Sequence, residues 1–325
     1  MTRLLLWAST LIVPLIVPLI VPLGTAAQDW PAKQPIKIVV PFSAGSATDI
    51  TARTVFDQVG KQIGQTFVVE NRGGGGTTLG MNAAAKADPD GYSMLVHSTS
   101  HVVVASTYAK LPFSVAADFV GVTALASIPF VVATATKYKT LNDLIETGKK
   151  SGSNILYGTA GAGSSGQLFM ERVRLAAGFP ATHVPFRGTP EGMNELVAGR
   201  LDVYPAPALN AIPLARDGKV SALAVSSPKR LPLMPEVATL AEAGLPGAIY
   251  NFWVGAFLPA KTPKPIVERL NREIVAALKV KDVADKIIAL GGDPNPMTPA
   301  EFDAFVRKEI AINAEIVKAS GYVPQ

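Results

Sequence analysis

Two loops rich in glycine and hydroxyl side chains constrain the fold of this chain more than any other feature. They cover residues 41–49, PFSAGSATD, and residues 158–166, GTAGAGSSG. Each follows an apolar run typical of a strand and precedes a pattern with helical spacing. A helix start carries unpaired backbone N–H groups and about half a unit of positive charge, so each loop is predicted to cradle an anion. Two such loops predict two lobes that close on one small anionic ligand.

The succession of strand, loop and helix occurs twice, which predicts an α/β protein with two lobes. After residue 258 the pattern predicts only helices, and this tail is expected to pack on the first lobe. We therefore expect lobe 1 to comprise residues 28–127 and 252–325, and lobe 2 residues 128–251, with a hinge between them. Each lobe is expected to hold a mixed, mainly parallel sheet flanked by helices, because strand, helix and strand in succession form parallel crossovers.

Residues 1–27 differ from the rest of the chain. Arg3 precedes an uncharged stretch from Leu4 to Leu23, and the small residues 25–27 follow it. This order is typical of a cleaved export signal, residues 1–27. The stretch is also about as long as a membrane-spanning helix needs, so an uncleaved anchor is the alternative. Three prolines within the stretch oppose a continuous helix and favour the signal peptide.

Composition excludes several kinds of site. The chain has no cysteine, so disulfides, thiolate metal ligands and cysteine nucleophiles are excluded. A formal net charge of +5 without long runs of like charge gives no sign of nucleic-acid binding. The pair His97 and His101 has a spacing seen in metal sites, but a position in a loop after a strand is favoured for it. We expect neither a metal nor a cofactor.

The first loop presents hydroxyls beside exposed N–H groups, for which a carboxylate is the natural guest. Thr48 or Asp49 is also expected to cap the helix, and Asp49 is favoured as a first-turn partner of the helix dipole over a ligand contact. Further hydroxyls follow the carboxyl end of another strand, where ligands bind in parallel sheets. The candidate contacts of this half are Phe42, Ser43, Ala44, Gly45, Ser46, Thr48, Asp49, Ser98 and Thr99.

The second loop contains G-x-G-x-x-G at Gly161, Gly163 and Gly166, which is also a fingerprint of dinucleotide binding. That fingerprint requires an acidic residue after the next strand, whereas this strand ends at Arg187, which suits only a phosphorylated ribose. An NADP-binding oxidoreductase is therefore the enzymatic alternative. The serine-hydrolase motif G-x-S-x-G is absent from this loop. As an anion cradle, the loop offers Thr159, Ala160, Gly161, Ser164 and Ser165 as candidate contacts.

Ordered motifs from about Trp30 to the C-terminus resemble the Bug-type periplasmic solute receptors of tripartite tricarboxylate transporters. The motifs are residues 38–42 with Gly45, Thr48, Asp49, Ala52 and Arg53, then residues 69–72, 88–92, 183–188, 218–219 and 222–225, and Trp253 with Gly255. The resemblance implies a two-lobe, type II-like periplasmic binding protein that is a monomer and not an enzyme. It also implies that this receptor delivers a small organic acid to a membrane permease. A receptor that serves a sensor kinase is a further alternative.

The resemblance also implies which loops hold the ligand. The family uses the loops that match Phe42 to Asp49 and Thr159 to Ser165 to bind carboxylate groups. Two departures alter the expected pocket: the first loop has Ala44-Gly45-Ser46 where Pro-Gly-Gly is common, and residues 204–207 read YPAP where Phe-Asp-Asn is frequent. Tyr204 and Pro205 thus join the candidate contacts, and their low polarity favours an apolar or aromatic ligand body over a citrate-like one. A dicarboxylate is retained as a candidate.

Overall fold

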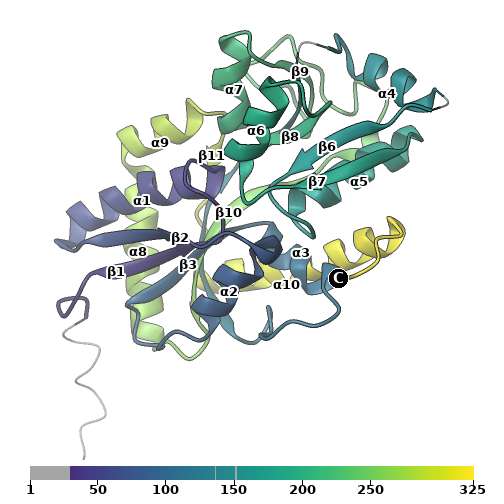
Figure 1. Ribbon diagram of the computed structural model, residues 1–325. Helices are drawn as coiled ribbons and strands as arrows, with labels where there is room; N and C mark the ends of the chain where they lie inside the picture. Colours follow the sequence, from purple (N-terminus) through teal and green to yellow (C-terminus); the bar gives the residue numbers. More distant parts are fainter. Residues whose placement is uncertain (1–29, 136, 151) are drawn as a thin grey trace, which may run out of the picture.

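The computed structural model describes residues 30–135, 137–150 and 152–325, and the predicted signal peptide lies outside these residues. Figure 1 shows two lobes, one below and to the left and the other above and to the right. Within the described residues, no helix combines the length and the apolar character that a membrane crossing requires.

The larger lobe is built on a six-stranded sheet of order β11-β4-β10-β3-β1-β2. β1 is parallel to β2 and β3, whereas β10 is antiparallel to β3 and β4. The strands β1, β3 and β10 are mostly buried because helices cover the sheet, and β10 is apolar along its whole length. The elements of this lobe are β1 (Ile36–Val40), α1 (Ala47–Ile63), β2 (Phe67–Asn71), the 3-10 turn η1 (Gly75–Thr77), α2 (Thr78–Ala85), β3 (Ser93–Ser98), α3 (Ser100–Thr107), β4 (Phe119–Ser127), β10 (Trp253–Pro259), α8 (Lys264–Lys279), α9 (Lys281–Ile288), β11 (Asp293–Pro294) and α10 (Pro299–Ala319).

The smaller lobe holds an antiparallel sheet of order β8-β5-β9 and a parallel pair, β6 and β7. An isolated bridge between Tyr157 and Val203 joins the two groups of strands. The elements of this lobe are β5 (Phe130–Thr134), α4 (Leu141–Lys149), β6 (Ile155–Thr159), α5 (Ser165–Ala177), β7 (Ala181–Pro185), α6 (Thr189–Val197), β8 (Tyr204–Pro207), α7 (Ala208–Arg216), β9 (Ser221–Val225) and the 3-10 turn η2 (Pro246–Ala248).

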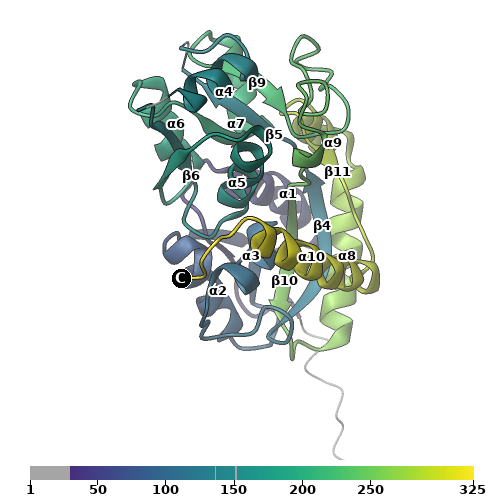
Figure 2. The ribbon, with the colours of Figure 1, turned by 90° about the vertical axis from the view of Figure 1, so that its right-hand side faces the viewer.

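The predicted α/β class with mixed sheets is confirmed. The parallel crossovers predicted for β1, β2 and β3 are present. Antiparallel pairs are nevertheless more numerous than predicted, and the sheets are not mainly parallel. The physical reason is the path of the chain, since β4 leads out of the larger lobe and β10 returns to it, so the two neighbours run in opposite directions (Figure 2).

The C-terminal helices pack on the larger lobe. α8 packs against α1 and β4, and α10 packs against α3 and β4. Phe302 of α10 is fully buried over Gly121 and Gly255, where an added Cβ would lie 2.8 and 2.3 Å from its ring. Glycine in both strands thus makes room for an aromatic ring. One detail of the prediction was wrong, because the two-residue strand β11 interrupts the helical tail and pairs with β4.

The chain passes between the lobes twice. β4 ends at Ser127 and β5 begins at Phe130, while the return segment lies between β9 and β10. The two connections contact each other: the Ile128 N–H donates to the Phe252 carbonyl at 2.8 Å, and Ser127 Oγ donates to Asn251 Oδ1 at 3.1 Å. The lobes are therefore joined at one edge by two adjacent, hydrogen-bonded segments.

Asp49 holds the loop between β1 and α1 in shape. Its buried carboxylate accepts hydrogen bonds from the Gly45 N–H at 2.9 Å, from Arg53 Nε at 3.0 Å and from Asn71 Nδ2 at 2.9 Å. Burial opposes ionisation, but the hydrogen bonds from Arg53, Gly45 and Asn71 outweigh it and hold the pKa of Asp49 below its ordinary value. One carboxylate thereby ties the loop, the first turn of α1 and the end of β2 together.

Replacing this carboxylate should destabilise the protein in a pH-dependent way. Asp49→Ala leaves buried donors unpaired, and we expect it to cost about 2 kcal/mol of unfolding free energy at pH 7. Because the folded-state pKa of Asp49 lies below the unfolded value, its contribution is complete above the unfolded pKa and is lost as pH falls through the folded pKa. Thermal denaturation from pH 7 to pH 3 should therefore show the wild type and the variant converging.

Asp57→Ala is the matched control, since Asp57 lies on the same helix but its ion pair with Lys61 is exposed. It should change stability little. An Asp49→Ala protein as stable as the control at pH 7, or an unchanged gap at pH 3, would contradict the proposed role of the Asp49 network.

Candidate ligand-binding site

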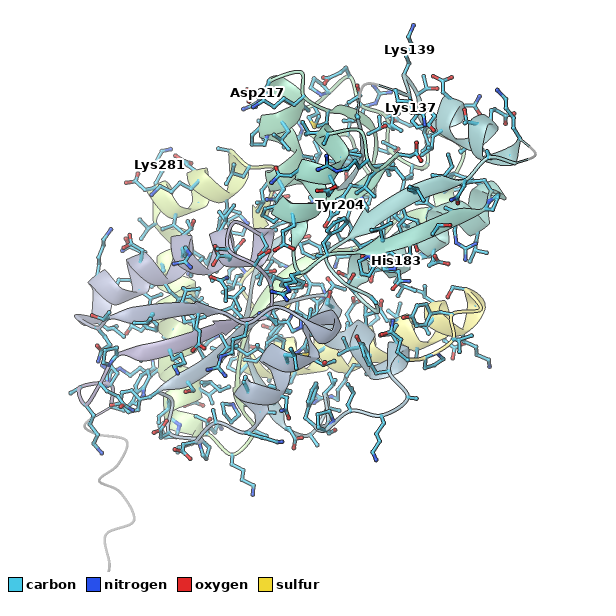
Figure 3. All side chains as sticks on the ribbon, in the orientation of Figure 1. Lys137, Lys139, His183, Tyr204, Asp217 and Lys281 are labelled. Atoms are coloured by element: carbon cyan, nitrogen blue, oxygen red, sulfur yellow. The ribbon has the colours of Figure 1, made fainter. Side chains whose placement is uncertain are left out.

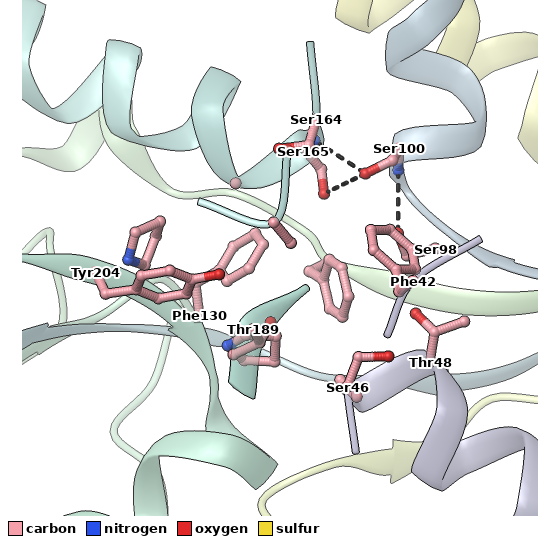
Figure 4. Close-up of a pocket in the computed structure, with 16 residues that line it drawn as sticks. Phe42, Ser46, Thr48, Ser98, Ser100, Phe130, Ser164, Ser165, Thr189 and Tyr204 are labelled. Atoms are coloured by element: carbon pink, nitrogen blue, oxygen red, sulfur yellow. Dashed lines mark hydrogen bonds between the residues drawn. The ribbon is translucent and has the colours of Figure 1, made fainter. Parts of the chain in front are cut away.

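A small pocket of about 30 Å³ lies between the lobes (Figure 4). The larger lobe contributes the first loop and the end of β3, and the smaller lobe contributes the second loop, α6 and β8. Among the described residues, no charged side chain lines it. The lining consists of Phe42, Ser46, Ala47, Thr48, Ser98, Ser100, Phe130, Ala160, Ser164, Ser165, Gly166, Thr189, Tyr204, Pro205, Pro207 and Phe252.

The structure brings most of the predicted contacts from both lobes together in this one pocket. The predicted residues that line it are Phe42, Ser46, Thr48, Ser98, Ala160, Ser164, Ser165, Tyr204 and Pro205. The remaining candidates do not line the pocket, namely Ser43, Ala44, Gly45, Asp49, Thr99, Thr159 and Gly161. The Asp49 carboxylate is used by its hydrogen bonds within the larger lobe, including the one from Arg53, and the residue lies in the first turn of the helix as expected.

The first cradle is the start of α1. The N-cap is Ser46 and not Thr48 or Asp49, because the helix begins at Ala47 and Ser46 Oγ accepts the Asp49 N–H at 3.3 Å. The N–H groups of Ala47 and Thr48 have no hydrogen-bond partner within the described residues. Both residues line the pocket, so the positive end of α1 faces it.

The second cradle is the start of α5. Its N-cap Ser164 accepts the Gln167 N–H at 3.4 Å, while the Gly166 N–H has no partner within the described part of the chain. The Ser165 N–H donates to Ser100 Oγ of the other lobe at 3.0 Å, and the two serine hydroxyls are also 3.0 Å apart. A hydroxyl oxygen from the larger lobe therefore occupies part of the second cradle (Figure 4).

Further hydrogen bonds connect the lobes around the pocket. Thr107 Oγ1 lies 3.0 Å from the Gly163 carbonyl oxygen, and the Tyr108 hydroxyl lies 3.2 Å from that of Ala162. On the other side, Asn210 Nδ2 donates to the Gly45 carbonyl at 2.9 Å. The structure thus shows the lobes closed on each other.

Glycines permit this close approach. A Cβ on Gly76 would lie 2.0 Å from the Ala162 carbonyl oxygen, and one on Gly163 would lie 2.8 Å from Thr107 Oγ1. Gly161 lies close to the Gly76 backbone, because a Cβ added to Gly161 would lie 3.2 Å from the Gly76 Cα. Gly188 meets the first loop, where a Cβ would lie 1.9 Å from Ser43 Oγ. Contact between the lobes therefore explains Gly161 and Gly163 of G-x-G-x-x-G without a nucleotide.

Sequence reasoning missed seven of the lining residues: Ala47, Ser100, Phe130, Gly166, Thr189, Pro207 and Phe252. Ala47, Ser100 and Gly166 adjoin predicted contacts, so the strand-to-helix pattern was a signal for them. Phe130 and Phe252 come from the two connections between lobes, and their rings lie 4.7 Å apart. No local motif marks them, because they meet only when both connections are placed.

The histidines lie outside the pocket. His101 is fully buried and stacked on Phe257, and burial lowers its pKa to about 3. Burial, with His101 nearby, also holds the pKa of His97 well below its ordinary value. His183 lies 2.6 Å from Thr159 Oγ1, and burial lowers its pKa to about 4. In the described residues, no cluster of three or more His, Asp or Glu side chains is arranged to hold a metal ion.

Comparison with known proteins agrees with this geometry. Residues 51–322 match the family model described as tripartite tricarboxylate transporter family receptor. Protein BugT of Bordetella pertussis is 32% identical over 302 residues, which cover 91% of this chain and 92% of BugT.

Two solved structures are similar over nearly their full length. MatC of Rhodopseudomonas palustris, with bound malate, is 31% identical, covers 88% of this chain and 99% of its own, and has a TM-score of 0.84. R. palustris Rpa4515, with adipate, is 29% identical, covers 91% of this chain and 100% of its own, and has a TM-score of 0.87. The family match and the shared fold show that this chain belongs to the receptors of the tripartite tricarboxylate transporter family.

Proposed function

We propose that the protein is a periplasmic receptor that closes its two lobes on a small organic carboxylate and delivers it to the permease of a tripartite tricarboxylate transporter. The observation that carries this proposal is the pair of helix starts that face one pocket from opposite lobes. The unpaired N–H groups of Ala47, Thr48 and Gly166 give that pocket a positive potential. A carboxylate supplies the acceptors that these donors lack.

The lining also narrows the class of ligand. Without a charged side chain among its described lining residues, the pocket has no carboxylate to pair with an ammonium group, so amino acids fit it poorly. The relatives MatC and Rpa4515 hold malate and adipate, which are organic acids without an ammonium group. Aromatic rings of Phe42, Phe130 and Phe252 contact the body of the acid.

Closure is part of binding in this proposal. A cavity of about 30 Å³ has room for little more than a water molecule, so the ligand takes the place where Ser100 now contacts Ser165. Hydrogen bonds to a charged group contribute roughly 1.5–3 kcal/mol each, so three or four suffice for the roughly 8 kcal/mol of micromolar binding. The hinge lies where residues 127–130 and 250–253 cross between the lobes, which divides the chain into residues 28–127 with 252–325 and residues 128–251.

The remaining features follow from the receptor role. Residues 1–27 act as a cleaved export signal that carries the chain to the periplasm. The protein works as a monomer, without a cofactor, and releases its ligand unchanged. Its partner is the membrane permease, which recognises the closed form.

The first test is stabilisation by carboxylates. Malate, adipate, butyrate and benzoate are added to the purified protein in a thermal-shift assay. A ligand at a hundred times its dissociation constant adds about 2.7 kcal/mol of stability, so at least one acid should raise the melting temperature by several degrees. Mass spectrometry of the incubated acid should recover it intact.

A variant that fills the pocket checks the location. A Cβ on Gly166 meets no atom closer than 3.6 Å, so Gly166→Leu should fold while its side chain occupies the cavity and abolishes the shift. Gly247→Leu is the control, because nothing lies within 4 Å of its Cβ, and it should keep the shift. Stabilisation of Gly166→Leu by the same acid, or turnover of the acid, would refute the proposal.

The second test concerns closure. Gly188 has extended backbone, with φ of −173°, so Gly188→Ala introduces no backbone strain but drives a methyl group into Ser43 Oγ. We expect this variant to bind the stabilising acid at least tenfold more weakly. We also expect it to lack the decrease in radius of gyration that small-angle scattering should record when the wild type binds.

Two further variants distinguish a steric block to closure from a general loss of stability. Gly247→Ala, with open space around its Cβ, should close and bind like the wild type. Adding Ser43→Gly to Gly188→Ala removes the obstructing hydroxyl and should restore part of the affinity. Normal compaction of the Gly188→Ala protein would show that closure does not bring these two loops together.

A further inference from the structure

The hydroxyl of Tyr204 is a buried polar group without a partner. Tyr204 is 1% exposed, and within the described residues its hydroxyl makes no hydrogen bond. Figure 3 places the residue in the smaller lobe near its border with the larger lobe, and Figure 4 shows its hydroxyl pointing into the pocket. Leaving such a group unpaired costs free energy, so phenylalanine would be the more stable residue here unless something else uses the oxygen.

The ring is fixed in this orientation. A Cβ on Gly158 would lie 2.8 Å from a ring carbon of Tyr204, and a Cβ on Gly192 would lie 2.2 Å from another. Two glycines on β6 and α6 thus form a slot that only a flat ring enters. On β8, Tyr204 pairs with Ala133 of β5, which fixes the backbone as well. The hydroxyl therefore cannot turn away to find another partner.

The surroundings of the hydroxyl provide few other polar groups. Pro205 and Pro207 follow on the same strand and have no N–H to donate. Thr189 is the polar side chain on this wall of the pocket, and Phe130 lies nearby. Burial raises the pKa of Tyr204, and the nearby Thr189 side chain offsets this rise only in part. Thr189 does not reach hydrogen-bonding geometry with the Tyr204 hydroxyl, which therefore stays protonated and free to donate to a ligand. This wall thus presents one fixed donor in apolar surroundings.

We propose that Tyr204 determines the specificity of the pocket by donating a hydrogen bond to a neutral oxygen of the ligand. The ligand is then a small monocarboxylate that carries a hydroxyl or keto group away from its carboxylate. This inference rests on the proposed receptor function. The helix starts take the carboxylate, and the phenol takes the second oxygen. A second carboxylate is disfavoured at this wall, because no cationic side chain lines the described pocket to offset a second negative charge.

The test compares acids that differ by one oxygen. The pairs are butyrate with 4-hydroxybutyrate, pentanoate with 4-oxopentanoate, and benzoate with 4-hydroxybenzoate. Calorimetry with the wild type should give at least one pair in which the oxygenated acid binds tenfold or more tightly than its parent. Tyr204→Phe should lose that preference while its affinity for the parent acid stays within about twofold. Without ligand, the variant should melt at the same temperature as the wild type or higher, because it removes an unpaired hydroxyl.

Tyr138→Phe is the matched control. Its hydroxyl lies 3.3 Å from Asp202 Oδ1 and the residue does not line the pocket, so this variant should keep the preference of the wild type. A wild type that binds carboxylates without preferring an oxygenated member, or a Tyr204→Phe variant that retains the preference, overturns the inference and leaves the receptor function intact. Tighter binding of malate or adipate than of every monocarboxylate overturns it too. Failure of all these acids to bind the wild type refutes the receptor function itself.

Discussion

The unpaired N–H groups at the starts of α1 and α5 are the constraint on which the rest of the site depends. Each helix start concentrates partial positive charge on donors that its own backbone cannot satisfy. In this structure the two starts lie in opposite lobes and line the same pocket. Ser100 of the larger lobe already satisfies one of these donors, the Ser165 N–H. The N–H groups of Ala47, Thr48 and Gly166 stay unpaired in this closed arrangement, and in the proposed receptor they are the donors that the carboxylate of the ligand fills.

Bringing two backbones this close requires positions without side chains. Gly76, Gly163 and Gly188 each lie where a Cβ would collide with the opposite lobe. These glycines are far apart in the sequence, yet they serve one purpose, which is contact across the cleft. A motif such as G-x-G-x-x-G therefore has two physical readings. In one, glycine lets a pyrophosphate approach the backbone. Here, glycine lets the other lobe approach it.

Local patterns predicted the helix starts well, because a cap and its first turn form within a few residues. The prediction located both loops, and it erred only by two or three residues over the cap of α1, which is Ser46. Partners far along the chain could not be predicted. Asn71 reaches Asp49 across 22 positions, and Phe130 and Phe252 meet only because two separate connections run side by side. Tyr204 was predicted to line the pocket, but its unpaired hydroxyl appears only once Gly158 and Gly192 fix the ring.

A pocket that binds charge with backbone donors has a consequence for release. An arginine or lysine in one lobe would keep its attraction for a carboxylate when the lobes part. Here the described lining holds only hydroxyls, N–H groups and apolar surface, divided between the two lobes. Opening removes the donors of one helix start together with the apolar walls, and water then solvates the carboxylate again. In the proposed receptor, affinity is thus tied to closure, and opening of the lobes alone lowers the affinity without any competition for a fixed charge.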